Sequence, residues 1–141
     1  MKLLPLKQCI SIEIPLFLTR VQAGFPSPAD DYLDRGLDLN EHLIEHPAAT
    51  FYARASGSSM TGLGIFEGDL LIVDRALEPR HGDVVIALIN GELTCKVLDT
   101  HQRRLLSANP RFTPIPITDE LDMVVEGVVT HTVRHHRIGR R

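Results

Sequence analysis

Residues 84–98 read VVIALINGELTCKVL and decide the fold of this 141-residue chain. Two apolar runs flank Asn90 and Gly91, and both of these residues tolerate the positive φ angles that a two-residue hairpin turn requires. The segment therefore predicts an antiparallel β-hairpin. Because side chains alternate along a strand, Lys96 lies on the face opposite Cys95, among aliphatic residues that can partly desolvate its ammonium group.

Outward from this hairpin, the chain continues to indicate strands. Residues 70–73 and 123–133 are also rich in β-branched and aliphatic side chains, and glycines and prolines separate these runs. Residues 1–32 contain four prolines, which block a long helix and favour an extended arm. Asp38 followed by Glu41 predicts the start of a short helix. We expect a mainly β fold of several short, mostly antiparallel strands, with one or two short helices and an extended N-terminal arm.

Composition narrows the possible functions. With 43% hydrophobic residues, the chain can bury one core, so we expect one domain plus an arm. A net charge of -3 provides no global field that attracts DNA or an anionic membrane, which makes proteins the expected partners. Cys9 and Cys95 lie far apart in sequence, which argues against a disulfide framework or a cysteine-based zinc site. The expected location is a reducing cytoplasm.

The N-terminus imitates a signal peptide, with Lys2, an apolar stretch and the small-residue signal Val21-Gln22-Ala23. Polar residues and prolines interrupt the apolar stretch, for example at Glu13 and Pro15, so we do not interpret it as a signal peptide. No segment approaches the roughly 20 apolar residues of a transmembrane helix, and no membrane partner is expected.

Two residues offer peptidase chemistry. A serine hydroxyl is a poor nucleophile at neutral pH and needs a base within hydrogen-bond distance. Ser59 lies in the run ASGSSM at residues 55–60, and a neutral Lys96 can be its base. Lowering the pKa of an ammonium group from about 10.4 to about 7 costs roughly 4 to 5 kcal/mol, which burial can impose. The backbone N–H groups of Ser59 and Met60 are candidates for an oxyanion hole.

The first substrate of such a site can be the chain itself. Residues 21–25 offer a bond between two small residues, Ala23 and Gly24, in a stretch with little reason to be packed. Small residues let an extended segment lie close to the backbone of a narrow site, and the following Pro26 and Pro28 keep it out of a helix. The sequence thus predicts self-cleavage.

Plainer interpretations stand beside these. Taken alone, Ser59 is typical of a turn or helix cap, and Lys96 of a solvated edge strand. Glycines 62, 64 and 68 are most simply turn residues, and no P-loop lysine follows them. His131, His135 and His136 do not predict a metal site, because on a strand the third points away from the other two and no carboxylate or cysteine is nearby in sequence. We expect no metal and no cofactor.

Four motifs resemble the LexA/UmuD family of self-cleaving Ser-Lys peptidases in order and spacing: SGSSM at 56–60, GDLLIVD at 68–74, HGDVVIA at 81–87 and GELTCKV at 91–97. Residues 23–32, 38–40 and 46–47 are similar to the UmuD-like branch in particular. The resemblance implies Ser59 as nucleophile, Lys96 as general base and Ala23-Gly24 as the scissile bond. It divides the chain into an arm, residues 1–23, and a β-rich peptidase domain, residues 24–141.

The resemblance also implies a biological role. UmuD-like proteins lose a short arm and then serve, as homodimers, with an error-prone Y-family polymerase catalytic subunit (UmuC-like) in translesion synthesis during the SOS response. A RecA filament on single-stranded DNA activates the cleavage, and residues 14–18 would help dock the sliding clamp. The about 23 residues before the bond cannot hold the DNA-binding domain of a LexA-type repressor.

Alternatives remain at this point. The chain can be a non-catalytic dimeric binding module that regulates a polymerase, or a LexA-like peptidase or repressor fragment. Its tail, residues 134–141, is longer and more basic than the family requires. Four arginines there can contact DNA phosphates, or can simply be solvated.

Overall fold

The computed structural model describes residues 11–17, 21, 23–24 and 33–137. The chain divides into two compact units, Met1–Glu45 and His46–Arg141. Each unit is considered by itself. Among the described residues, no helix has the length and apolar character needed to cross a membrane.

The N-terminal unit contains a two-stranded antiparallel sheet of β1 (Ile14–Phe17) and β2 (Leu33–Leu37), followed by α1 (Leu39–Leu43). Gly36 permits the close approach of the two strands, because a Cβ at this position would lie 2.7 Å from the Cβ of Glu13. The Asp38 carboxylate caps α1 by accepting a hydrogen bond from the Asn40 backbone N–H, as the sequence predicts. The strand pairing of β1 was not predicted, because proline content indicates only an extended chain and not its partner.

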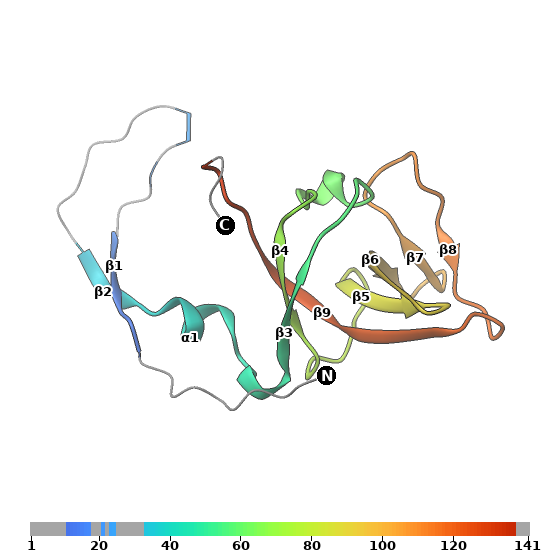
Figure 1. Cartoon of the computed structure of the whole chain (residues 1–141), viewed down its shortest axis with the longest axis horizontal. Coiled ribbons are helices and arrows are strands. Elements are labelled where there is room, and N and C mark those ends of the chain that lie inside the picture. The colour runs from blue at the N-terminus through green and yellow to red at the C-terminus, as the bar shows by residue number, and fades with distance from the viewer. Residues whose placement is uncertain (1–10, 18–20, 22, 25–32, 138–141) are drawn as a thin grey trace. The chain divides into compact units, whose positions relative to one another are not determined.

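The second unit is a seven-stranded sheet in the order β3-β4-β9-β5-β6-β7-β8 (Figure 1). Neighbouring strands are antiparallel throughout, which confirms the predicted mainly β fold. The elements are η1 (Pro47–Ala49), β3 (Thr50–Arg54), η2 (Thr61–Leu63), β4 (Leu70–Asp74), β5 (Val84–Ile89), β6 (Glu92–Asp99), β7 (Arg104–Leu106), β8 (Ile115–Pro116) and β9 (Met123–Val133). The β5–β6 hairpin turns at Asn90 and Gly91 with φ angles of 49° and 84°, the positive values expected of this dipeptide.

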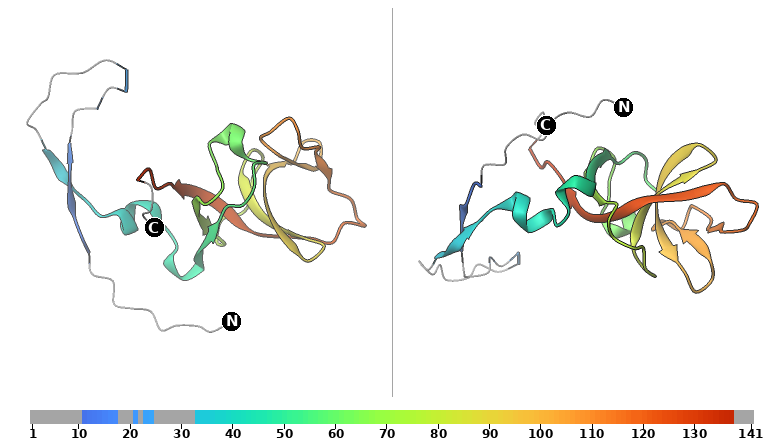
Figure 2. Two further views of the ribbon diagram at one scale, coloured as in Figure 1. Left: turned by 45° about the horizontal axis from the view of Figure 1, so that its top comes forward. Right: turned by 90° about the horizontal axis from the view of Figure 1, so that it is seen from below.

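Strand β9 joins the two halves of this sheet. Its first half pairs with β5 and its second half with β4, so it runs through the unit between the strands of both ends (Figure 2). Gly127 lies next to the change of partner, where a Cβ would approach the Val73 side chain to 2.7 Å. Glycine therefore allows β9 to pass β4 closely at this point.

Two apolar clusters fill the unit. One contains Met60, Ile65, Leu71, Val73 and Ile86, and the other Val85, Ala87, Leu98, Leu105 and Val128. Full burial of each large side chain contributes roughly 1.5–3 kcal/mol to folding. Cys95 packs against the first cluster and Leu98 belongs to the second, so the two faces predicted for the strand around Lys96 are correct. Met60, a member of the first cluster, is the residue that follows the candidate nucleophile in the chain.

Candidate active site

The candidate nucleophile lies in the loop between β3 and η2. Ser59 is half-buried, and the next residue, Met60, is 3% exposed within the core. The Met60 carbonyl accepts hydrogen bonds from the backbone N–H groups of Leu63 and Ile65, at 3.1 and 3.3 Å. The loop is therefore anchored immediately after Ser59 by a buried side chain and by its own backbone.

The candidate base comes from β6. Lys96 pairs with Val85 across the β5–β6 hairpin and is only 8% exposed. Its Nζ donates a hydrogen bond to the Ser59 Oγ at 3.0 Å. The structure therefore brings together the two residues selected from sequence, although 37 positions separate them.

The electrostatic surroundings favour loss of the lysine proton. Burial lowers the pKa of Lys96, and among the described residues no carboxylate forms an ion pair with it. The neighbouring Cys95 thiol has a pKa raised by burial to about 11, so it is neutral near pH 7 and does not hold the lysine in its charged form. A neutral amine within hydrogen-bond distance of a serine hydroxyl can accept its proton.

A second loop supports the nucleophile. The Ala108 backbone N–H donates to the Ser59 carbonyl at 2.8 Å, and the Gly62 N–H donates to the Ala108 carbonyl at 2.7 Å. The Asn109 Nδ2 donates to the Ser58 carbonyl at 2.9 Å. Gly62 is required by this contact, because a Cβ would lie 2.4 Å from the Ala108 carbonyl oxygen. Nothing in the local sequence around Ala108 or Asn109 indicated this role.

The two oxyanion candidates are the backbone N–H groups of Ser59 and Met60. Among the hydrogen bonds that the described residues form, none is donated by the backbone N–H of Ser59 or Met60. Backbone N–H groups in a loop next to a nucleophile are the type of donor that an oxyanion hole uses.

A cavity of about 190 Å³ adjoins Ser59, between β3 and the start of β6. Small side chains, Ala53, Ala55 and Gly57, form part of its wall. Apolar and polar groups of β6 line the other side, at Leu93, Thr94 and Cys95. A cavity beside the Ser59 hydroxyl that has both small and apolar residues in its wall can admit a peptide segment.

The predicted scissile bond lies in the N-terminal unit. Ala23 and Gly24 form an exposed bend, and a Cβ added to Gly24 would meet no atom within 4 Å. Their neighbours Gln22 and Phe25 lie outside the described residues, as do Pro26 and Pro28.

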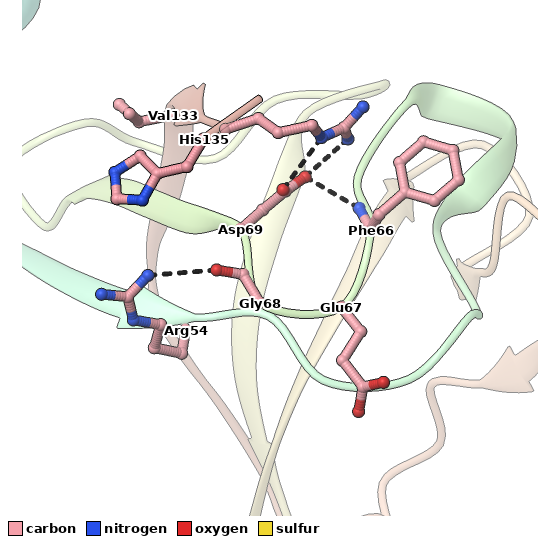
Figure 3. Close-up of a pocket in the computed structure, with 8 residues that line it drawn as sticks. Arg54, Phe66, Glu67, Gly68, Asp69, Val133 and His135 are labelled. Atoms are coloured by element: carbon pink, nitrogen blue, oxygen red, sulfur yellow. Dashed lines mark hydrogen bonds and ion pairs between the residues drawn. The ribbon is translucent and has the colours of Figure 1, made fainter. Parts of the chain in front are cut away.

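The basic tail begins with a structural ion pair. Arg134 donates through Nε and Nη2 to the Asp69 carboxylate, at 3.0 and 2.6 Å, and also through Nη2 to the Gly64 carbonyl. Its guanidinium lies 4.3 Å from the Phe66 ring centroid, and its hydrogen bond to Asp69 holds the pKa of that carboxyl below its usual value. The Asp69 carboxylate also accepts a hydrogen bond from the Phe66 N–H (Figure 3). Both residues line a cavity of about 530 Å³. Neither Ser59 nor Lys96 lines this larger cavity.

The rest of the described tail is exposed. His135, His136 and Arg137 have exposed side chains, and residues 138–141 lie outside the described part of the chain. Of the four tail arginines, Arg134 thus joins the end of β9 to the loop before β4 through its hydrogen bonds. Contact between the tail and DNA stays a prediction.

Outside the tail, three residues bring potential metal ligands together. One ligand atom each of His81, Asp99 and His101 lies within 4.8 Å of the others. However, the His81 Nδ1 accepts the Thr100 N–H, and the Asp99 carboxylate accepts two backbone N–H groups and the Arg104 Nε. The two imidazole rings stack, with centroids 3.7 Å apart and planes at 12°. Lone pairs in parallel ring planes do not converge on one ion, so this group fits a metal poorly.

The sequence that forms this mainly β unit is similar to the sequences of known proteins. The chain belongs to the peptidase S24-like family, whose model matches residues 15–130. The family expected from the four sequence motifs, the LexA/UmuD family, is thereby confirmed.

Particular relatives cover most of the chain. Protein ImpA of Salmonella typhimurium is 49% identical over 129 residues, which are 87% of this chain and 85% of ImpA. Protein MucA of Escherichia coli is 42% identical over 127 residues, 89% of this chain and 87% of MucA. The LexA repressor of Pseudomonas chlororaphis is 36% identical over 118 residues, 82% of this chain but 58% of the repressor.

Proposed function

We propose that this protein is a self-cleaving peptidase that cuts its own chain between Ala23 and Gly24, with Ser59 as nucleophile and Lys96 as general base. The observation that carries the proposal is the 3.0 Å hydrogen bond between Lys96 Nζ and Ser59 Oγ, formed by a lysine that is 8% exposed. A solvated edge-strand lysine, the plainer interpretation, would not be buried against a serine hydroxyl.

The hydrogen bond between Lys96 and Ser59 supports the following reaction. Neutral Lys96 accepts the Ser59 proton as Oγ attacks the Ala23 carbonyl carbon, and the N–H groups of Ser59 and Met60 stabilise the oxyanion. The Lys96 ammonium then donates its proton to the Gly24 nitrogen as the peptide bond breaks, which leaves an ester between Ser59 and Ala23. Water, deprotonated by Lys96, hydrolyses this ester, releasing the Ala23 carboxylate and restoring the Ser59 hydroxyl.

The cut separates two paired strands. Residues 1–23 contain β1, and residues 24–141 retain β2, its hydrogen-bonded partner in the N-terminal unit. While the chain is intact, the connection between the strands keeps β1 at high effective concentration beside β2. Once the bond is cut, β1 is free to dissociate, and the edge of β2 becomes available. We propose that this change converts the precursor, residues 1–141, into the active form, residues 24–141.

Family membership and the relatives support a proposal for the role of the product. We propose that the processed protein is a homodimeric accessory subunit of an error-prone, UmuC-like Y-family polymerase in SOS mutagenesis, with cleavage activated by a RecA filament on single-stranded DNA. Residues 14–18 would help dock the sliding clamp; Leu18 lies outside the described residues. We propose that the protein acts in the cytoplasm.

Comparison of the two forms with a polymerase tests this role. Residues 24–141, isolated after self-cleavage, are expected to bind the partner polymerase differently from uncleavable full-length Ser59→Ala and to stimulate lesion bypass more. The physical reason is the loss of the β1 partner from β2. Binding is measured by titration of the polymerase, and stimulation by primer extension across a lesion. Equal affinity and equal stimulation by the two forms would reject the switch even if the proteolysis proved correct.

A further inference from the structure

An aromatic side chain covers the candidate base. Phe112 lies in the segment between β7 and β8, and its ring centroid is 5.9 Å from the Lys96 Nζ. The ring is 43% exposed, whereas the lysine is only 8% exposed. Phe112 therefore stands at the solvent-facing border of the surroundings of Lys96.

The same segment is fixed to the loop of the nucleophile. The Phe112 N–H donates to the Asn109 carbonyl at 3.1 Å, and the Asn109 side chain donates to the Ser58 carbonyl. Ala108, the residue before Asn109, donates its backbone N–H to the carbonyl of Ser59, the residue after Ser58. Asn109 also accepts the Arg111 N–H through its Oδ1, which closes the turn that presents the ring. The segment that carries Phe112 and the loop that carries Ser59 are thus joined by hydrogen bonds.

A ring beside an ammonium group has two opposite effects. Its negative face attracts the cation, and its carbon atoms displace the water that solvates the cation. At 5.9 Å the cation–π attraction is near the roughly 6 Å limit at which it acts, so we expect the displacement of water to dominate.

Among the described residues, few other ionisable groups lie where they can influence the pKa of Lys96. Its own strand contributes the Cys95 thiol, which stays neutral near pH 7, and the nucleophile loop contributes the Ser59 hydroxyl. Arg111, next to Phe112, is exposed, and among the described residues no carboxylate pairs with the lysine. The residues around Lys96 therefore influence its pKa mainly by shielding the amine from water.

We propose that Phe112 is a positioning residue that acts through Lys96: it keeps water from the amine and holds the amine toward Ser59. Asn109 fixes the Phe112 segment to the loop of the nucleophile. This inference rests on the proposed self-cleavage, whose base it makes effective near neutral pH.

The first test is the pH profile of unassisted cleavage in three variants. Phe112→Ala is expected to move the midpoint toward alkaline pH by about half to one unit, which lowers the rate near pH 7 roughly three- to tenfold and preserves the alkaline plateau. Phe112→Leu and Phe112→Tyr retain the bulk that excludes water and are expected to stay close to the wild-type profile. The matched control is Phe66→Leu, because Phe66 is 44% exposed and lies beside a different cation, Arg134.

Three results would overturn the proposal. They are an unchanged midpoint in Phe112→Ala, a loss of rate that is equal at every pH, and a loss in Phe112→Leu as large as that in Phe112→Ala. The conservative variants keep the test valid where Phe112→Ala does not fold, because a marked alkaline shift in both would also contradict shielding by bulk.

A second measurement does not depend on cleavage. The sequence contains only three lysines, at positions 2, 7 and 96, so protein labelled with ¹³C-lysine gives few signals, and Lys96→Arg identifies the one from Lys96. In a Ser59→Ala background, adding Phe112→Ala is expected to raise the NMR titration midpoint of Lys96. An unmoved midpoint would overturn the role of Phe112. Absence of cleavage in wild-type protein, with the midpoint moved as expected, would instead reject the proposed function alone.

Discussion

Replacing Ser59 by alanine is expected to stop self-cleavage, with a loss of about 10⁴-fold or more, while the fold persists. The reason is that the Ser59 hydroxyl is the group to which the Lys96 Nζ is hydrogen-bonded. The substitution removes one side-chain hydrogen bond, which costs about 1 kcal/mol and leaves the backbone bond from Ala108 to Ser59 intact. Cleavage is followed by the appearance of a shorter chain, and folding by circular dichroism.

The neighbouring serine provides a matched control. Ser58 is exposed, and among the described residues its hydroxyl takes part in no hydrogen bond; only its carbonyl is used, by Asn109 and Thr61. Ser58→Ala keeps that carbonyl and is expected to cleave within about twofold of wild type. Survival of cleavage in Ser59→Ala, or an equal loss in Ser58→Ala, would contradict the assignment of the nucleophile.

Cleavage without an activator should accelerate as the pH rises. Burial lowers the pKa of Lys96, and the amine becomes a base only when it loses its proton. Below that lowered pKa the neutral fraction, and with it the rate, should rise about tenfold per pH unit and then reach a plateau. An activator can reach the same rate at neutral pH by shielding the lysine further.

Two substitutions of the lysine separate charge from packing. Lys96→Arg is expected to be inactive at every pH, because a guanidinium stays protonated. Lys96→Met is also expected to be inactive, yet at least as stable at neutral pH. Because burial lowers the pKa of Lys96, the ammonium form is less stable in the folded protein than in the unfolded chain. This cost is fully present below the folded pKa, falls as the pH rises through it, and disappears only above the unfolded pKa. A flat rate profile from neutral to alkaline pH, or substantial cleavage by Lys96→Arg, would remove Lys96 from the mechanism.

Local patterns in the sequence were sufficient for the strands that form the site. Asn90 and Gly91 set the β5–β6 hairpin through their backbone angles, and alternation then put Lys96 and Cys95 on opposite faces. The pairing of Ser59 with Lys96, in contrast, came from resemblance, because a spacing of 37 residues has no periodic meaning for a hydrogen bond across a sheet.

The residues that hold the Ser59 loop in place could not be predicted from local sequence patterns. Ala108 and Asn109 contact the nucleophile loop only because β6 and β7 return the chain to it, and no sequence pattern near either residue reports that return. The pairing of β1 with β2 is hidden for the same reason. Arg134 was interpreted as part of a basic tail, whereas its ion pair with Asp69 depends on β9 lying beside β4.

The position of the cut is the most direct test of the central claim. Intact-mass analysis compares purified wild-type protein before and after incubation at alkaline pH, or with a RecA filament, with Ser59→Ala treated in parallel. We predict two products in the wild-type sample alone, residues 1–23 and residues 24–141, which sum to the mass of the intact chain plus one water. A cut at any other bond, an unchanged mass under both conditions, or the same products from Ser59→Ala would contradict the claim that Ser59 and Lys96 cleave the Ala23–Gly24 bond.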